Sequence, residues 1–454
     1  MGLSLRPLLG QYLTRHETWA EMARGFTDYL ARSSFLLQQG RFAADIAFFY
    51  GEEGPVTALY GDGGPGDLPE GYAYDFVGAD ALARQLSVVD GRLVSAGGTA
   101  YRVLYLGGSA RRMTTATLLR ITELVKAGCV LVGDRPVASP SLADDRQAFE
   151  RVADELWARP LRSPRAVGRG EVWSGASLRE VLAALQIAPD WQFDRHGGDD
   201  ARLAVLHRRL DQGELYFVSN RASRPVEGRL TVRASGRTVE IWRADDATIT
   251  PVTWRREGQR TEIPLRLEGE DAVFVVLRGP TAASGEVATQ VQFTSLAELS
   301  SGWHVAFDAA PYEAAPPALR SWHESTNREI RYFSGRATYS NHFEVPATSL
   351  EHGRLLLDLG EVHEVASVSI NGRPAGNAWK PPYRLDVGEL LVPGRNVVEV
   401  TVANLWVNRL IGDAQPGSTA RAFTTGPTYR ADAPLKPSGL IGPVRLLAAT
   451  RAEH

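Results

Sequence analysis

The chain of 454 residues is longer than one hydrophobic core usually supports, so its length predicts about two to four domains. Its charge is nearly balanced, with 50 basic and 53 acidic residues, which argues against nucleic acid or an anionic membrane as the main partner. The single cysteine, Cys129, excludes a disulfide framework within the chain. Its place in the apolar run CVLVGD predicts a buried structural thiol.

Export and membrane signals are the next features to consider. The sequence has no apolar run of about 18 residues or more, and Met1–Gly10 is too short and too broken by proline for the apolar core of a signal peptide. We therefore expect a soluble chain without an export signal, and its location stays open.

The first predicted element is a helix over Arg15–Gln39, where apolar residues recur at helical spacing until Gly40 supplies a stop. Thr14 and Glu17 fit the S/T-x-x-E capping box that starts a helix. The apolar stripe is wide and no strand precedes it, which is typical of a domain whose first part is absent.

Residues 41–188 alternate between short apolar runs and amphipathic segments. FAADIAFFY, YRVLYLGG and CVLVGD read as buried strands, and TTATLLRITELVKAG and RQAFERVADELWA as helices. This alternation predicts an α/β domain with a mostly parallel sheet. The glycine-rich stretches YGDGGPGD and LGGSARRMTTAT fit neither common nucleotide-binding pattern, so nucleotide binding is disfavoured.

After residue 188 the helical patterns stop. Runs such as GELYFVSN and DAVFVVLRG predict an antiparallel β-sandwich over 189–290, and a second β-rich block follows over 291–454.

One stretch of the last block, NVVEVTVANLWVNRLIGD, begins as a strand and then changes character. If the strand continued, Val398, Val400 and Val402 would share a face with Asn404, Trp406 and Asn408. We therefore expect the three valines in the core and the later residues beyond it, facing the N-terminal helix or a neighbouring domain.

Several stretches together resemble a known family. RYFSGRATYSNHFEV, NLWVNRLIGD and PSGLIGPVRLL resemble the C-terminal galactose-binding-like jelly roll of large glycoside hydrolases. HETWAEMARGFTDYLARSSFLLQQGRFAADIAFFYGEE, with the later YAYDFVGADAL, resembles the region that leaves the catalytic barrel in α-L-rhamnosidases of glycoside hydrolase family 106. The stretches from APDWQF to VEIWRAD are similar to the sandwich that joins those parts.

The resemblance implies a multidomain fold in four parts. They are a remnant of the last helix and loop of a (β/α)8 barrel over 1–40, an α/β domain of flavodoxin or glutamine-amidotransferase type over 41–188, a β-sandwich over 189–290, and the jelly roll over 291–454. The implied enzyme releases terminal α-L-rhamnose from glycosides or polysaccharides with inversion, using one carboxylic acid and one carboxylate.

The resemblance also implies where the chemistry lies. The barrel would supply both carboxyl groups and a calcium site, so the acid and base are expected upstream of Met1, and no cofactor or metal is expected in this chain. The partners would be a carbohydrate substrate and the barrel, in cis or in trans. The chain alone is expected to be inactive.

The first group of candidate sugar contacts surrounds Glu17. Loops at the carboxyl end of a barrel carry active sites, so Arg15, His16, Glu17 and Trp19 are candidates for touching the sugar. The capping box explains Glu17 without chemistry, and both interpretations stay open.

The second group lies in the last block, where aromatic, amide and ionic side chains gather as sugar recognition requires. Its members are Trp379, Tyr383, Asn404, Trp406, Asn408, Arg409 and Asp413. Alternatively, the two asparagines satisfy backbone groups, Arg409 pairs with Asp413, and Trp379 covers the core. The nine histidines are scattered, and no metal-ligand spacing is present.

Two rival functions remain at this stage. The first is a non-catalytic carbohydrate-binding or accessory protein built from the same domains. The second is a glycosidase of another family, such as a β-galactosidase-like enzyme, that reuses a jelly roll of this type.

Overall fold

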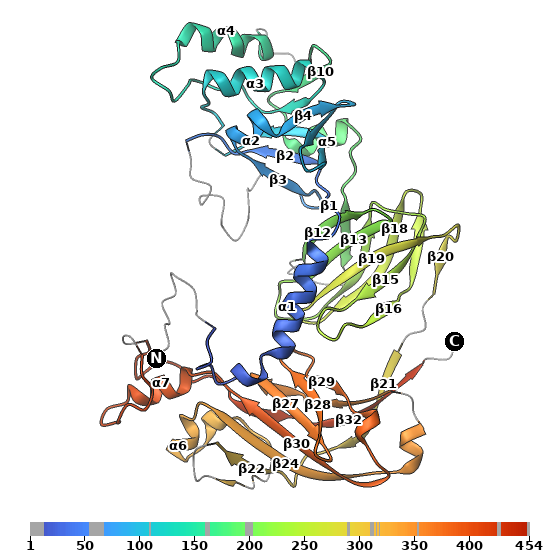
Figure 1. The fold of residues 1–454 in the computed structure, drawn as a ribbon, viewed down its shortest axis with the longest axis vertical. Helices are drawn as coiled ribbons and strands as arrows, with labels where there is room; N and C mark the ends of the chain where they lie inside the picture. The colour runs from blue at the N-terminus through green and yellow to red at the C-terminus, as the bar shows by residue number, and fades with distance from the viewer. Residues whose placement is uncertain are drawn as a thin grey trace. The chain divides into compact units, whose positions relative to one another are not determined.

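The computed structural model describes residues 13–53, 68–108, 110–158, 164–195, 203–287, 291–308, 313–314, 316, 318–351, 354–424 and 428–451 (Figure 1). The chain forms two compact units. One comprises Met1–Ser33, Ala244–Ala247 and Ala288–His454, and the other comprises Ser34–Arg243 and Thr248–Val287. The glycine-rich stretch YGDGGPGD, residues 60–67, lies outside the described residues.

An α/β part fills the first half of the second unit. Its sheet has the order β3-β2-β7-β8-β10-β9, and all neighbours are parallel except β10 and β9. The strands are β2 (Ile46–Phe49), β3 (Tyr74–Val77), β7 (Val103–Leu106), β8 (Val130–Val132), β9 (Arg165–Val167) and β10 (Gly170–Trp173). The helices are α2 (Ala79–Arg84), α3 (Thr115–Lys126), α4 (Arg146–Leu156) and α5 (Leu178–Ala184). A small antiparallel sheet joins β4 (Leu86–Val89), β5 (Arg92–Ser95) and β6 (Ala100–Tyr101).

Both faces of the parallel sheet are covered, which explains why its strands read as continuous apolar runs. All four residues of β2 are buried. Ala47 and Phe49 join one core cluster with residues of α3 and α4, while Ile46 joins another with residues of α5. The helices begin at polar caps, Thr114 for α3 and Asp145 for α4, whose side chains accept backbone hydrogen bonds.

A β-sandwich forms the rest of the second unit. Its two sheets have the orders β1-β12-β13-β19-β15-β16 and β11-β14-β18-β17-β20, and all pairs within them are antiparallel. The strands of the first sheet are β1 (Arg41–Phe42), β12 (Leu203–Leu210), β13 (Gly213–Asn220), β15 (Arg237–Trp242), β16 (Ile249–Pro251) and β19 (Ala272–Pro280). Those of the second are β11 (Trp191–Arg195), β14 (Val226–Val232), β17 (Trp254–Glu257), β18 (Arg260–Leu267) and β20 (Gly285–Glu286).

The first unit is built around a jelly roll with antiparallel sheets of the orders β21-β32-β25-β29, β23-β22-β24-β30-β27-β28 and β26-β31. Its strands are β21 (Val291–Glu298), β22 (His304–Phe307), β23 (Glu313–Ala314), β24 (Arg336–Val345), β25 (Arg354–Asp358), β26 (Glu361–His363), β27 (Val365–Ile370), β28 (Arg373–Ala378), β29 (Arg384–Asp386), β30 (Gly394–Ala403), β31 (Gly439–Gly442) and β32 (Arg445–Arg451). Val398, Val400 and Val402 are fully buried in its core, as the sequence predicts.

The short helices of the first unit lie between these strands. They are α6 (Arg328–Arg331), α7 (Val407–Asp413), and the 3-10 turns η3 (Trp322–Glu324), η4 (Ala347–Glu351) and η5 (Gly388–Leu390). No helix in the described part of the chain is long and apolar enough to cross a membrane.

The N-terminal helix begins later than predicted. A 3-10 turn, η1 (Ala20–Met22), precedes α1 (Arg24–Leu37), and residues 15–19 form turns. The predicted capping box is therefore wrong, because Glu17 lies well before the helix and its backbone N–H donates to the carbonyl of Thr14 at 3.1 Å. His16, Thr18 and Met22 of this segment also form hydrogen bonds with the jelly roll.

Candidate functional site

The N-terminal segment is bound to one end of the jelly roll, and most of the predicted site residues meet there. The Thr18 hydroxyl donates to the backbone carbonyl of Asn404, and the Trp406 indole N–H donates to the carbonyl of His16 at 2.9 Å. The Asn377 side chain donates to the carbonyl of Met22 at 3.0 Å. Hydrogen bonds between side chains and backbone carbonyls therefore fix the turn before α1, and helix propensity alone does not reveal them.

An aromatic group completes this contact. Trp379 lies against Phe26 and Tyr29 of α1, with ring centroids 5.4 and 5.1 Å apart, and Phe26 meets Trp19 edge to face at 6.1 Å. Trp19 and Trp379 also pack on a cluster of buried side chains that includes Met22. Both tryptophans therefore hold the N-terminal segment on the jelly roll, and Trp379 covers α1 rather than the sandwich core.

The polar candidates of the segment differ in exposure. Arg15 is exposed, His16 is half-buried, and Glu17 is only 6% exposed. The Nε2 atom of His16 is buried and has no hydrogen-bond partner among the described residues. Their contact with a sugar stays a prediction.

The stretch after β30 corrects the expectation that Asn404, Trp406 and Asn408 all lie beyond the core and face the N-terminal helix or a neighbouring domain. The strand ends at Ala403 and α7 begins at Val407, so the two-residue period no longer relates Asn404, Trp406 and Asn408. Trp406 alone of the three side chains bonds the N-terminal segment. The chain turns here because both asparagines bind neighbouring loops of the jelly roll.

Those two asparagines are 1% exposed and fully bonded inside the jelly roll. Each donates its Nδ2–H to the Ser438 hydroxyl, at 3.1 Å from Asn404 and 3.0 Å from Asn408. Their oxygens accept the backbone N–H of Gly335 at 3.0 Å and of Lys436 at 2.8 Å. The alternative that they satisfy backbone groups is the one that the structure supports.

The remaining candidates also have internal partners. The Nε of Arg409 lies 2.9 Å from Asp413 Oδ1, one helical turn away, and Asp413 Oδ2 accepts the backbone N–H of Arg421 and of Ala422. Tyr383 is 7% exposed in the core, and burial, reinforced by the charges of two glutamates, raises its pKa to about 12. Its hydroxyl is therefore protonated at neutral pH.

Sequence reasoning missed one carboxyl group at this end of the jelly roll. The backbone N–H of Glu364 donates to the carbonyl of Ala403 at 2.9 Å, which places it beside the end of β30. Burial raises the pKa of Glu364, and the charges of His363 and Lys436 oppose that rise. Nothing in the run EVHEVAS distinguishes this glutamate from one at a solvated strand edge.

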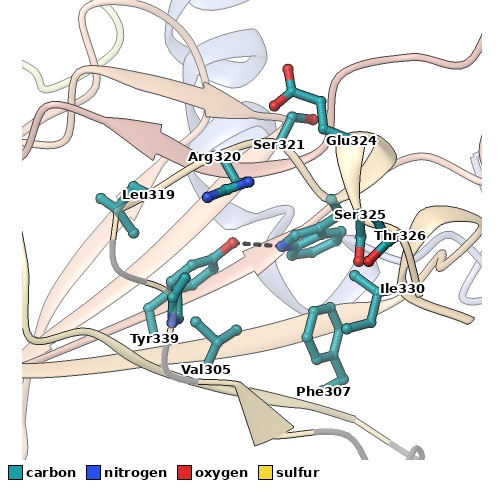
Figure 2. Close-up of a pocket in the computed structure, with 12 residues that line it drawn as sticks. Val305, Phe307, Leu319, Arg320, Ser321, Glu324, Ser325, Thr326, Ile330 and Tyr339 are labelled. Atoms are coloured by element: carbon teal, nitrogen blue, oxygen red, sulfur yellow. Dashed lines mark hydrogen bonds between the residues drawn. The ribbon is translucent and has the colours of Figure 1, made fainter.

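A separate cavity of about 230 Å³ opens in the jelly roll between β22, β24 and the segment that contains η3 (Figure 2). The Trp322 indole N–H donates to the Tyr339 hydroxyl at 2.5 Å, and both rings are at most 4% exposed. Arg320 and Glu324 stand at its rim, as Figure 2 shows. Since its aromatic faces are covered, the cavity offers no open ring for a sugar to stack on, and none of the predicted site residues lines it.

In the α/β part, side-chain carboxylates of the chain occupy the helix N-terminus at which a phosphate could bind. At the start of α3, the backbone N–H of Thr114 donates to Glu52 at 2.6 Å and that of Thr115 donates to Asp144 at 2.7 Å. These N–H groups are the ones that would hold a phosphate at a helix N-terminus. The chain's own carboxylates use them, which agrees with the absence of a nucleotide-binding pattern in LGGSARRMTTAT.

Among the described residues, no three His, Cys, Asp or Glu side chains stand close enough together to hold a metal ion.

Two family profiles match separate parts of the chain. The profile of the α-L-rhamnosidase family, glycoside hydrolase family 106, matches residues 1–256. The profile of the glycosyl hydrolase 2 galactose-binding domain-like family matches residues 322–428.

Two longer proteins match nearly the whole chain. A rhamnosidase from Novosphingobium sp. PP1Y of known structure is 41% identical, with a TM-score of 0.85, over 96% of this chain and 42% of its own. A putative β-glucuronidase of Formosa agariphila is 23% identical over 89% of this chain and 53% of its own length. The chain thus spans about half the length of its relatives or less. With more than half of its residues matched by the family profile, the chain belongs to the α-L-rhamnosidase family, glycoside hydrolase family 106.

Proposed function

We propose that this chain is the C-terminal region of an enzyme that releases terminal α-L-rhamnose from glycosides or polysaccharides, with inversion at the anomeric carbon. The likeness to the Novosphingobium rhamnosidase over 96% of the chain is the observation that carries the proposal. The family profile over residues 1–256 supports it independently of the jelly roll.

The chemistry itself is assigned to a barrel that this chain does not span. An inverting glycosidase needs two carboxyl groups roughly 6.5 to 9.5 Å apart, with room for a water molecule on one face of the sugar. In the candidate site, the carboxylate of Asp413 is engaged by the backbone N–H groups of Arg421 and Ala422. The calcium ion that the family resemblance implies is likewise assigned to the barrel.

The part proposed for this chain is to complete the enzyme around that barrel. The segment from Arg15 to Trp19 is fixed against the jelly roll, and its His16 carries a buried ring nitrogen without a hydrogen-bond partner. By this proposal Arg15, His16 and Trp406 form the part of the rim that this chain contributes.

We also infer that the α/β part belongs to the flavodoxin-like class of doubly wound sheets. In chain order its five parallel strands run 2-1-3-4-5, which is the order of that class. The N-terminus of α3, whose N–H groups are bonded to Glu52 and Asp144, favours a structural role for this part.

Two rivals remain to be separated. The galactose-binding-like profile over residues 322–428 favours a non-catalytic carbohydrate-binding protein, and the name of the Formosa relative favours a glycosidase with another specificity. The test is hydrolysis by the chain joined to the part of the Novosphingobium rhamnosidase that it does not match, assayed on aryl α-L-rhamnoside, aryl β-glucuronide and aryl β-galactoside. Hydrolysis of the rhamnoside and of neither other glycoside supports the proposal. Turnover of either other glycoside in its place contradicts it, and binding to the sugars without turnover of any substrate favours the accessory protein.

A further inference from the structure

The chain crosses twice between the sandwich and the α/β part of the second unit, and the two crossings meet. Residues 43–45 lead from β1 into the α/β part, and residues 187–190 lead back to β11. The first crossing bonds the sandwich through the backbone N–H of Ala43, which donates to the carbonyl of His207 at 3.0 Å. The second is bonded by the N–H of Arg233, which donates to the carbonyl of Asp190 at 2.8 Å.

Each crossing carries one buried aspartate, and one guanidinium holds both. Asp45 and Asp190 are 4% and 2% exposed. The Arg233 Nη2 atom lies 2.7 Å from Asp45 Oδ2 and 3.5 Å from Asp190 Oδ1, and its Nη1 donates to the carbonyl of Ala188 at 2.8 Å. Arg233 therefore ties the incoming segment to the returning one.

His207 extends this cluster into the sandwich. Its Nδ1 lies 2.9 Å from Asp190 Oδ2 and its Nε2 lies 2.9 Å from Glu214 Oε2, while the Tyr216 ring stacks on it with centroids 3.9 Å apart. Ionised carboxylates only accept hydrogen bonds. Both ring nitrogens must donate for both contacts to hold, so the geometry requires the imidazolium cation.

Three carboxyl groups and three guanidinium groups surround the His207 ring. The charged and titratable groups around the ring, from every element packed against it, are Asp45, Asp190, Glu214, Tyr216, Arg102, Arg209 and Arg233. Arg233 pairs with Asp45 and Asp190, and Arg102 lies 3.7 Å from Asp45. Glu214 contacts His207, which also contacts Asp190. Burial on its own lowers the pKa of His207, but its hydrogen bonds to Asp190 and Glu214, with their charges, outweigh burial and raise it.

The two crossing segments, residues 43–45 and 187–190, together form a hinge between the sandwich and the α/β part. We propose that protonated His207 is a pH-sensitive lock on this hinge: it holds the two crossing segments to the sandwich at acidic and neutral pH and releases them at alkaline pH. The direction follows from linkage. Because the pKa is higher in the folded state, the stabilisation is fully present below the unfolded imidazole's pKa and is lost as the pH rises through the folded pKa. Deprotonation leaves a ring-nitrogen lone pair facing either Asp190 or Glu214, which breaks one of the two contacts. The lock is independent of any glycosidase activity of the protein.

Amide hydrogen exchange of the full chain tests the lock directly. We expect the protection of peptides covering residues 43–47 and 187–192, corrected for the intrinsic pH dependence of exchange, to fall between about pH 6 and about pH 9.5. Peptides at the centre of the sandwich, in β13 and β19, should keep theirs over the same range. Equal protection of the hinge at both ends of the range, or equal loss everywhere, overturns the proposal.

Two variants and a control sharpen the test. His207→Gln should lose the acidic-pH protection of the hinge and remove its pH dependence. Glu214→Gln keeps an acceptor at a position that is 26% exposed but removes one charge, so release should move to lower pH. His342→Gln, an exposed histidine on β24, should leave the profile of the unmodified chain unchanged. If His207→Gln does not fold, the direction of the Glu214→Gln shift decides, and an unshifted or upward-shifted profile contradicts the lock.

Discussion

Trp379 of the jelly roll stands so close to Gly25 of α1 that a Cβ atom added to Gly25 would lie 2.9 Å from the Trp379 Cδ1 atom. The indole is enclosed by Phe26 and Tyr29, so it has little room to give way. This contact fixes how α1 lies on the jelly roll, and the absence of a side chain at Gly25 is what permits it.

Gly25→Ala should therefore destabilise the first unit. Alanine gains about 1 kcal/mol of helix propensity over glycine, but forced overpacking costs about 1 to 3 kcal/mol. We expect a net loss of about 1 kcal/mol, measured by denaturant unfolding. Gly97→Ala is the control, because its added Cβ would meet only the Ser95 hydroxyl, at 3.8 Å. An increase in stability at Gly25 would show that propensity outweighs the contact.

Trp406→Phe should loosen the segment before α1 without disturbing the core. The ring is kept, but the indole N–H that donates to the carbonyl of His16 is lost, and such a bond contributes about 0.5 to 1.5 kcal/mol. Hydrogen exchange of residues 13–23 should speed up accordingly. Trp242→Phe, which removes a similar indole bond to Glu240, should leave that segment as it is. Unchanged exchange in Trp406→Phe means that other contacts hold the segment.

Ser438→Ala should weaken the turn after β30. The buried Ser438 hydroxyl accepts from the side chains of Asn404 and Asn408, and removing it leaves two buried amides short of a partner. An unsatisfied buried group costs about 1 to 3 kcal/mol, so we expect the free energy of unfolding to fall by that amount and the unfolding midpoint to fall with it. Ser223→Ala, at an exposed position, is the control. A midpoint equal to that of the control would mean that the amides find other partners.

The sequence predicted the regular parts of the fold well and the turns poorly. The apolar run in FAADIAFFY and the amphipathic pattern of TTATLLRITELVKAG became β2 and α3, because burial on a covered sheet sets both patterns. The capping box at Glu17 failed, and so did the expectation that Asn404 and Asn408 lie beyond the core, because contacts with distant loops override local propensity there.

The charged hinge shows the same limit at a polar site. His207 is bonded to Asp190, 17 residues earlier, and to Glu214, seven residues later, while Arg233 reaches back to Asp45. No spacing rule joins these residues. The sandwich register and the return of the chain from the α/β part bring them together, and neither can be predicted from periodicity alone.

By the proposed function, this chain completes a rhamnosidase whose acid and base lie in a barrel that it does not span. The most direct measurement is release of nitrophenol from an aryl α-L-rhamnoside, with calcium added, by the purified 454-residue chain and by the same chain joined to the unmatched part of the Novosphingobium rhamnosidase. We predict turnover by the joined protein and none by the chain alone, because two positioned carboxyl groups are required. Turnover by the chain alone that survives replacement of every acid in its first forty residues would contradict the account and place the active site within this chain.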